Sequence, residues 1–209
     1  MTCLELRSDC CREDCIPVLE TERLTLRAPK LEDAKHVAAL ANDKRIAENT
    51  RRIPHPYSRA DAEDFIASAN LPKGVLHKGG LHKGDINFLI TTRTGVPVGA
   101  CGLAMPDDGV PEIGYWIGTK FWGRGYATEA ARAVIDFAFT ELDYDTLQAG
   151  ARVTNPASRR ILEKCGFQWT GVGLYRILAL NSSAPIDRFR LDRSLWMSLR
   201  RWSDVKRVS

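Results

Sequence analysis

The sequence predicts a single α/β domain, in which a mixed, mostly antiparallel sheet of about six or seven strands is flanked by helices. Three strand-like segments, residues 86–92, 97–104 and 112–118, are separated by short glycine-containing turns, which predicts an antiparallel meander. From residue 126 the pattern changes to helix, strand, helix, which is typical of a parallel crossover. With 209 residues, 44% of them hydrophobic, the chain suits one domain with a sizeable core.

The first elements follow from alternation and helical spacing. Residues 23–27 alternate polar with apolar side chains, which predicts a half-buried strand. Two amphipathic helices are expected at residues 31–41 and 61–69, where apolar side chains recur on one stripe. Between them, two prolines in residues 53–58 exclude a helix and predict a stiff, extended connection.

The second half of the chain repeats strand and helix patterns. A helix should open near Tyr126, because alanines and branched apolar residues follow it at helical spacing. A strand at 147–153, a helix at 156–165 and a strand starting at 167–172 come next. Residues 188–197 are expected to supply a final strand.

The two ends of the chain are expected to lie outside this domain. We divide the chain into a poorly ordered, cysteine-rich extension (1–18), one domain (19–199) and a basic tail (200–209). Four cysteines crowd the extension without the paired spacing typical of zinc sites, so no metal is expected. Cys101 and Cys165 lie in apolar segments and should be small core residues of a reduced protein.

The charge balance and the hydropathy pattern exclude several classes of partner. The net charge of +4 is too small to make nucleic acid the default partner, although it would tolerate an anionic cofactor. No apolar run reaches membrane-spanning length, and charged residues interrupt the segment where a signal peptide would lie. We therefore expect a cytoplasmic monomer or homodimer that contacts no membrane. A glycine- and lysine-rich near-repeat at residues 74–84 is expected to be a mobile loop, or else a basic flap facing the substrate.

The sequence around Gly123 and Gly125 predicts a phosphate site. It joins a strand to the helix at Tyr126, so exposed backbone N–H groups and the positive helix end should meet there. The glycines allow a diphosphate to approach the main chain, and Lys120 and Arg124 add positive charge.

Two other phosphate motifs fit this turn poorly. A P-loop would need Gly-Lys followed by Ser or Thr before its helix, and this chain has none. The third glycine of a dinucleotide fingerprint would fall at Thr128, and the predicted meander differs from repeated parallel units. We interpret Asp143, which stands where that fingerprint places its ribose-binding acid, as a coincidence.

Residues 19–173 carry several motifs that occur in the same order in one family. This part of the chain resembles the GNAT N-acetyltransferases, specifically the RimJ/RimL-like branch that includes ribosomal-protein N-terminal acetyltransferases. The matching segments are Thr-Glu-Arg-Leu-Thr-Leu-Arg at 21–27, Glu-Ile-Gly-Tyr-Trp-Ile at 112–117, Trp-Gly-Arg-Gly-Tyr-Ala-Thr-Glu-Ala at 122–130, Asn-Pro-Ala-Ser at 155–158 and Leu-Glu-Lys-Cys-Gly-Phe at 162–167. Lys120 stands where the family usually has Gln or Arg.

The resemblance implies that acetyl-coenzyme A is the co-substrate and that no metal takes part. In the family the strand at 112–118 splays from the next strand, and the pantetheine arm bonds to its backbone, here at Trp116 and Ile117. Asn155 would contact the same arm. The remaining cofactor-binding residues implied are those of the turn and the helix start: Lys120, Gly123, Arg124, Gly125, Tyr126, Ala127 and Thr128.

The implied reaction needs a neutral amine, a stabilised oxyanion and a leaving thiolate. Glu112 is our candidate base, directly or through water, and the resemblance implies that Ser158 would protonate or hydrogen-bond the leaving thiolate. A solvated strand-end glutamate and a helix-capping segment are the structural alternatives. Direct attack in a ternary complex is preferred to a cysteine-bound intermediate, because Cys101 and Cys165 look buried.

The acceptor is expected to be a primary amine, either a protein N-terminus or a small molecule. An α-amino group, with a pKa of about 7.7–8.0, needs less help from a base than a lysine amine near 10.4. In the family His55 and Tyr57 would border the acceptor pocket. A non-catalytic coenzyme A sensor or interaction module and, more distantly, a nicotinamide-nucleotide enzyme stay open as alternatives.

Overall fold

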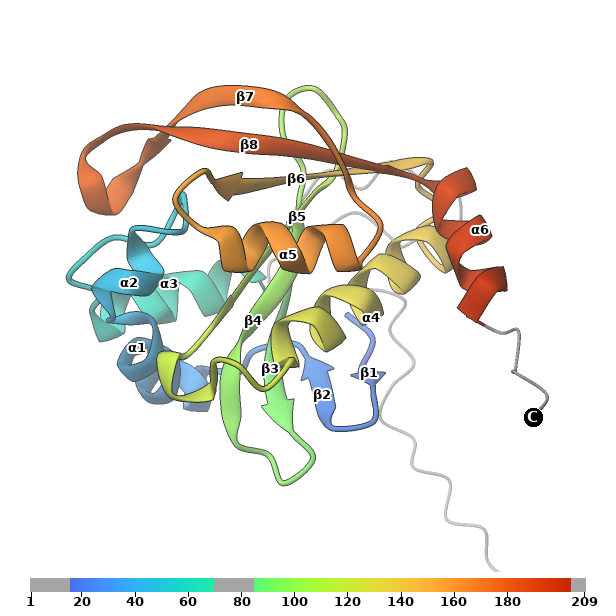
Figure 1. Ribbon diagram of the computed structural model, residues 1–209. Coiled ribbons are helices and arrows are strands. Elements are labelled where there is room, and N and C mark those ends of the chain that lie inside the picture. Colours follow the sequence, from blue (N-terminus) through green and yellow to red (C-terminus); the bar gives the residue numbers. More distant parts are fainter. Residues whose placement is uncertain (1–15, 70–84, 204–209) are drawn as a thin grey trace, which may run out of the picture.

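A computed structural model describes residues 16–69 and 85–203 (Figure 1). Its eight strands form one sheet in the order β1-β2-β3-β4-β5-β6-β8-β7, so the predicted mixed, mostly antiparallel sheet is confirmed with more strands than the six or seven expected. Only β5 and β6 pair in parallel. The strands are β1 (Leu19–Glu20), β2 (Leu24–Arg27), β3 (Ile86–Thr92), β4 (Pro97–Ala104), β5 (Glu112–Ile117), β6 (Thr146–Arg152), β7 (Gln168–Ile177) and β8 (Ser182–Asp192).

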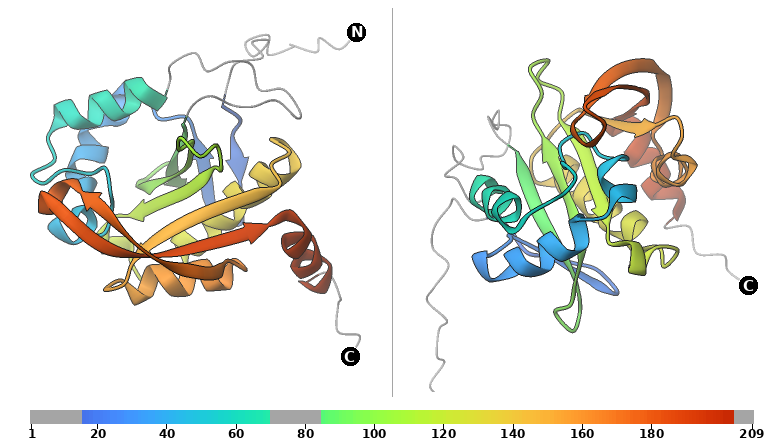
Figure 2. Two further views of the ribbon diagram at one scale, coloured as in Figure 1. Left: turned by 90° about the horizontal axis from the view of Figure 1, so that it is seen from above. Right: turned by 90° about the vertical axis from the view of Figure 1, so that its left-hand side faces the viewer.

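Helices cover both faces of the sheet (Figure 2). On one face, α1 and α3 pack against β3 and β4; on the other, α4 packs against β4 and β5, and α5 packs against β6. The α-helices are α1 (Ala34–Ala41), α2 (Lys44–Ala47), α3 (Arg59–Ala69), α4 (Tyr126–Thr140), α5 (Pro156–Lys164) and α6 (Arg193–Ser203). Three short 3-10 helices are η1 (Leu31–Asp33), η2 (Thr119–Phe121) and η3 (Leu178–Leu180).

The main core lies between the sheet and α4. Alanines and branched residues of α4 are buried at the helical spacing that the sequence predicted, and Phe137 meets Phe88 of β3 edge to face at 5.8 Å. Cys101 and Cys165 are both buried free thiols, as expected for core residues. A second core joins α1 and α3 to Leu89, with Trp116 of β5 packed against it. The strand β5 therefore contributes side chains to both layers.

The parallel pair of strands at the centre of the sheet separates after two residue pairs. β5 and β6 are in register only at Glu112 with Gln148 and at Ile113 with Ala149. From Gly114 onward β5 continues without a strand partner on this side within the described chain, although β4 still pairs with its other edge. This splay leaves backbone donors and acceptors of β5 facing an opening between the strands.

The C-terminal region differs from the prediction. The final strand expected at 188–197 is wrong in its second half, because β8 ends at Asp192 and α6 begins at Arg193. Short apolar runs do not distinguish a strand from a helix, and here packing decides: the Trp196 ring lies 5.1 Å from the Phe139 ring, and its Nε1 donates to Asp136 at 2.9 Å. The strand expected from 167–172 extends to Ile177 and forms a long hairpin with β8.

Three sequence-based expectations concern residues outside the described ranges. The near-repeat at 74–84 lies there entirely, as do residues 1–15 of the cysteine-rich extension expected at 1–18 and residues 204–209 of the basic tail expected at 200–209, whose first residues belong to α6. Among the helices of residues 16–69 and 85–203, none is long and apolar enough to cross a membrane.

Candidate active site

The glycine turn connects η2 to α4 and leaves its backbone accessible. Gly123 and Gly125 adopt left-handed conformations, with φ of +75° and +79°, a region that glycine enters without steric cost. A Cβ at Gly123 would meet nothing within 4 Å, and one at Gly125 would meet only Arg23 Nη2 at 3.3 Å. The surface above both glycines is therefore open to a ligand.

The start of α4 presents free N–H groups beside this turn. The first hydrogen bond of the helix is donated by Glu129 N–H to Gly125 O at 3.1 Å. The N–H groups of Tyr126, Ala127 and Thr128 precede it and therefore have no partner within the helix. The positive end of the helix dipole adds to them. An anion at this end would be favoured by both effects.

Arg23, at the start of β2, fastens this turn to the sheet. Its Nη1 donates to Arg124 O at 2.9 Å and its Nε to Glu129 Oε2 at 2.7 Å, while the guanidinium lies 5.2 Å from the Tyr126 ring centre. Thr21 Oγ1 also donates to Glu129, at 2.7 Å. We did not predict this role for Arg23, and no local pattern could have indicated it, because its partners Arg124 and Glu129 lie 101 and 106 residues further along the chain.

The two cationic side chains expected at the turn lie on its surface. Lys120 Nζ is 5.0 Å from the Phe121 ring centre, and the Arg124 guanidinium is 5.7 Å from the same ring. Both side chains are exposed and are held near the turn by contact with the ring. They add positive charge where the sequence predicted it.

The open edge of β5 is formed by alternate residues. Gly118 N–H donates to Val98 O at 2.8 Å, on the β4 side. Because backbone groups alternate along a strand, those of Trp116 also face β4, and those of Tyr115 and Ile117 face the splay. Ile117 O accepts from Trp122 Nε1 at 2.6 Å, which leaves the Ile117 N–H and both Tyr115 groups on the open side. Of the two predicted backbone contacts, the structure thus places Ile117 at the splay, while Tyr115 takes the position expected of Trp116.

The start of α5 lies across the splay from this edge. Asn155 caps the helix, accepting from Ser158 N–H at 3.1 Å, and Pro156 occupies the first turn. The Ser158 hydroxyl lies 3.0 Å from the Tyr115 hydroxyl, which is also 3.3 Å from Ser158 O. Burial raises the pKa of the Tyr115 phenol, so this hydroxyl stays protonated. Sequence reasoning did not single out Tyr115.

Glu112 lies at the mouth of the splay and is paired with an arginine. Its Oε2 is 2.7 Å from Nη1 of Arg51, in the loop after α2, and the Arg51 guanidinium lies 4.8 Å from the Tyr175 ring centre. A Cβ on Gly150 of β6 would lie 3.5 Å from Glu112 Oε1, so the carboxylate also reaches across to β6. The predicted base is therefore accessible, but it is held in an ion pair.

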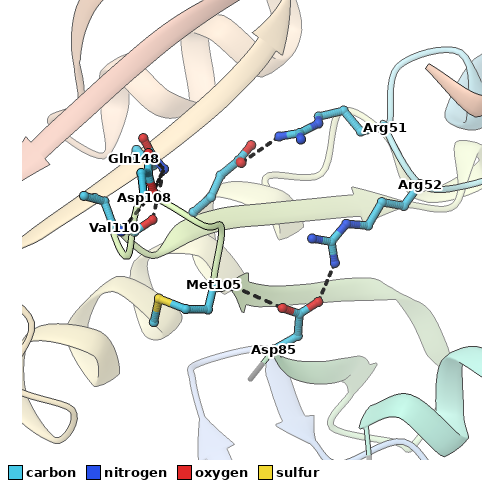
Figure 3. A network of polar contacts seen from close by, with 8 residues as sticks. Arg51, Arg52, Asp85, Met105, Asp108, Val110 and Gln148 are labelled. Atoms are coloured by element: carbon cyan, nitrogen blue, oxygen red, sulfur yellow. Dashed lines mark hydrogen bonds and ion pairs between the residues drawn. The ribbon is translucent and has the colours of Figure 1, made fainter. Parts of the chain in front are cut away.

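Further polar contacts surround Glu112. Figure 3 shows Arg52 bridging from the same loop to Asp85, which also accepts from Met105 N–H at 3.1 Å. On the opposite side, Gln148 Nε2 donates to Val110 O at 2.9 Å. Arg51 and Arg52, from one loop, thus both lie near the Glu112 end of the splay.

The two residues expected to border the acceptor pocket differ in burial. Tyr57 is buried in the core of α1 and α3; its N–H donates to Asn42 Oδ1 at 2.9 Å and its hydroxyl to Asp61 O at 3.1 Å. Burial raises the pKa of Tyr57 to about 12. The structure therefore gives Tyr57 a packing role, because its hydroxyl is turned toward α3. His55 is exposed, beside the cis peptide bond to Pro56.

Comparison with known proteins identifies this arrangement. The acetyltransferase (GNAT) domain matches residues 23–168, most of the described chain. The chain belongs to the GNAT acetyltransferase family. The N-acetyltransferase p20 of Bacillus licheniformis, itself uncharacterised, is 33% identical over 158 residues, which make up 74% of this chain and 84% of that protein.

Solved structures of GNAT acetyltransferases share the fold. A family member from Bacillus anthracis has a TM-score of 0.70 at 21% identity, over 85% of this chain and 99% of that one. RimL, a ribosomal L7/L12 alpha-N-protein acetyltransferase solved with coenzyme A, also has a TM-score of 0.70, at 17% identity over 84% of this chain and 98% of its own. The expected GNAT family is confirmed, and the protein is an acetyl-coenzyme A-dependent acetyltransferase. Its similarity to a ribosomal N-acetyltransferase of Bacillus subtilis, 43% identical over 67 residues, is consistent with the RimJ/RimL-like branch.

Proposed function

We propose that this GNAT acetyltransferase moves the acetyl group from acetyl-coenzyme A to a primary α-amine by direct attack in a ternary complex. The observation that carries the proposal is the open edge of β5, which runs from the glycine turn to Glu112. Phosphate-binding N–H groups lie at one end, Ser158 beside the middle and a carboxylate at the other end. One extended thioester can therefore meet all three.

The residues present fit the co-substrate. Its diphosphate would lie on the turn at Gly123 and Gly125 and on the N–H groups that open α4, with Lys120 and Arg124 nearby. The pantetheine amides would bond like an added strand to Tyr115 and Ile117. Gly114 supports this placement, because a Cβ there would meet nothing within 4 Å.

The chemistry can be assigned to two side chains. The amine nitrogen forms a bond to the acetyl carbonyl carbon, and the C–S bond then breaks with its electron pair left on sulfur. The amine gives up one proton, to Glu112 or to water bound by it. The sulfur takes one proton from Ser158, which regains one from solvent while Glu112 releases the amine proton to solvent. The net change is therefore the transfer of one proton from nitrogen to sulfur.

A covalent cysteine intermediate is disfavoured by burial. Burial raises the pKa of Cys101 and raises that of Cys165 to about 11, so both stay thiols at neutral pH. The thiolate is the nucleophilic form. Both side chains pack in the core around α4.

The acceptor proposed is an α-amine whose neighbouring groups are neutral or acidic. Arg51 and Arg52 are each paired with one carboxylate, Glu112 or Asp85, and keep further N–H donors that would bind an anionic group of the acceptor. Among structural relatives, RimL is named for α-N-acetylation of a ribosomal protein and another is named a spermidine N-acetyltransferase. The arginines favour the first type of acceptor.

An acceptor panel tests the proposal. Release of free thiol from acetyl-coenzyme A would be measured with peptides that begin with Ser-Asp or Ser-Lys, with the same peptides blocked at the N-terminus, and with spermidine. We expect the fastest release with the free Ser-Asp peptide. Coenzyme A binding without thiol release for any amine would instead support the sensor alternative, and spermidine as the best substrate would overturn the α-amine assignment.

A further inference from the structure

We propose that Tyr115 is a positioning residue that aims the proton of Ser158 at the departing sulfur. The inference rests on the proposed function, because it assigns Ser158 as the proton donor. It starts from one observation: the hydroxyls of these two residues are 3.0 Å apart, at the point where β5 and α5 face each other across the splay.

Within the described residues, the Ser158 hydroxyl has one hydrogen-bond partner, the Tyr115 hydroxyl. Its N–H is taken by Asn155 Oδ1 at 3.1 Å, so the cap holds the backbone of this residue in place. The cap does not orient the side chain, whose recorded contact is with Tyr115. A serine hydroxyl rotates freely about its Cβ–Oγ bond unless a partner restrains it.

The direction of the hydrogen bond decides where the serine proton points. The Tyr115 hydroxyl has one proton and two acceptors in reach, Ser158 Oγ at 3.0 Å and Ser158 O at 3.3 Å. When Tyr115 donates to Oγ, the serine proton is left free to point away, into the splay where the thioester sulfur would lie. The phenol can keep this role because burial keeps it protonated.

The same bond stabilises the charge that develops during transfer. As the C–S bond breaks, its electron pair stays on sulfur and Ser158 Oγ–H gives its proton to that sulfur. Negative charge then grows on Oγ, and a fixed donor aimed at it from the protein interior lowers the barrier. Tyr115 keeps its own proton, and Ser158 recovers one from water after coenzyme A leaves.

A purely structural role for the tyrosine hydroxyl is the competing explanation. By donating to Ser158 O, Tyr115 could simply hold the start of α5 against β5. The two roles differ in their dependence on the serine side chain. The structural bond ends on a backbone atom and survives Ser158→Ala, whereas the positioning bond does not.

The test is therefore a double-mutant cycle on the full-length protein. Tyr115→Phe should lower kcat about 10-fold, less than the roughly 100-fold or more expected for a group that itself transfers the proton, with the KM for acetyl-coenzyme A within about 2-fold. In the Ser158→Ala background the same change should lower kcat no further. Tyr144→Phe, which removes the hydroxyl of a partly buried tyrosine beyond α4, is the matched control and should leave kcat unchanged.

The other possible results of these measurements would contradict either the positioning role of Tyr115 or the proposed function. A further loss of kcat on adding Tyr115→Phe to Ser158→Ala, or a rise in the KM for acetyl-coenzyme A alone, would overturn the positioning role and support a structural one. Normal turnover of Ser158→Ala would overturn it as well. If the wild-type protein released no thiol with any amine, the proposed function itself would be wrong. This result would be known before any variant is made.

A second probe keeps the proposal testable if Tyr115→Phe unfolds. Fluorotyrosine placed at position 115 retains the hydroxyl and makes it a stronger donor. Its kcat should equal or exceed that of the wild type, with the KM for acetyl-coenzyme A unchanged. A clear fall in kcat, in protein that binds acetyl-coenzyme A normally, would contradict donation from the phenol to Ser158.

Discussion

Gly125 is subject to two constraints at a single position. Its φ of +79° lies in the left-handed region, and its α-carbon faces the surface where a diphosphate would approach the backbone. In the proposed function Glu112 is likewise constrained twice, since it would have to stay reachable by an amine while Arg51 holds it at 2.7 Å. At the residue scale the site therefore depends on backbone conformation at one end and on side-chain charge at the other.

Gly125→Val should abolish detectable acetyl-coenzyme A binding at concentrations that saturate the wild type, because the side chain covers the N–H groups of the turn. Strain from a branched residue at positive φ should also cost about 1–2 kcal/mol of stability. Gly109→Val is the matched control: φ there is +73° and a Cβ would meet nothing within 4 Å, but the turn is the one between β4 and β5. Calorimetric titration of both variants would refute the diphosphate site if they bound equally well.

Glu112→Gln should lower kcat about 100-fold, in the range of general-base effects, while the KM for acetyl-coenzyme A stays within about 2-fold. The amide keeps the shape of the side chain but accepts a proton poorly. Asp85→Asn is the control, since it breaks the neighbouring pair with Arg52 and removes a carboxylate from the same region. Equal losses in the two variants, measured by thiol release, would mean that the arginine loop matters and the base assignment is wrong.

At the element scale, α4 is held by hydrogen bonds to residues more than 100 positions earlier in the chain. Its first-turn Glu129 accepts from Thr21 and Arg23 of the N-terminal strand region, and Arg23 also bonds to Arg124 O inside the turn. Burial alone would raise the pKa of Glu129, but these hydrogen bonds outweigh it and lower the pKa below its ordinary value. The start of the helix is thereby fixed to the sheet.

Glu129→Gln should destabilise the protein by about 1 kcal/mol at pH 7, seen as a Tm lower by about 2–4 °C. A carboxyl whose folded pKa is lowered contributes stability above its unfolded pKa and loses it as pH falls through the folded pKa. The Tm difference should therefore shrink below about pH 4.5, the ordinary value for Glu. A difference independent of pH, measured against Glu63→Gln, which removes an i,i+4 surface ion pair with Arg59 on α3, would argue against the ionised contact.

At the scale of the whole molecule, the splay divides the sheet into two parts. β1 to β5 form one part, and β6, β8 and β7 form the other; they share only two residue pairs between β5 and β6. The core packed around α4 joins both parts, because it includes Ile113 of β5 and Ala149 and Ala151 of β6. The opening can therefore persist in a stable fold, and the proposed active site lies along it.

Ligand stabilisation tests the class of co-substrate for the molecule as a whole. Acetyl-coenzyme A at 100 times its Kd should stabilise the fold by about 2.7 kcal/mol, which corresponds to a rise in Tm of roughly 5–10 °C. NAD and NADP at the same concentration should leave Tm unchanged. A shift with NADP but none with acetyl-coenzyme A, in a thermal-shift assay, would refute the assignment.

Replacing Cys101 and Cys165 together by Ala should leave kcat within about 2-fold of the wild type, because direct attack uses neither thiol. The change removes buried sulfur atoms, so some loss of Tm is expected. The fraction folded must be checked by circular dichroism before rates are compared. Loss of thiol release in folded protein would contradict direct attack and favour a cysteine-bound intermediate.

Local sequence patterns were enough to predict those helices, strands and turns that have a clear sequence signature. The meander at 86–118, the helix at Tyr126 and the Asn155 cap all follow from spacing, turn residues and capping chemistry, and the structure has them within about two residues of the predicted bounds. The glycine turn was predicted for the same reason, since φ above zero and helix opening are local properties. Where the sequence signature was weak, the prediction was wrong. We predicted a strand where α6 lies, because its short apolar pattern is compatible with either a strand or a helix.

The sequence by itself determined the glycine turn before α4, the order of most strands and helices, and the family, because each depends on neighbouring residues or on motif order. Only the tertiary structure decided that Tyr115 meets Ser158, that Arg51 pairs with Glu112 and that Arg23 holds the turn, since these partners lie 43, 61 and 101 residues apart. It also decided which backbone groups of β5 face the splay. Contacts between distant residues depend on how strands register and separate, which no local pattern specifies.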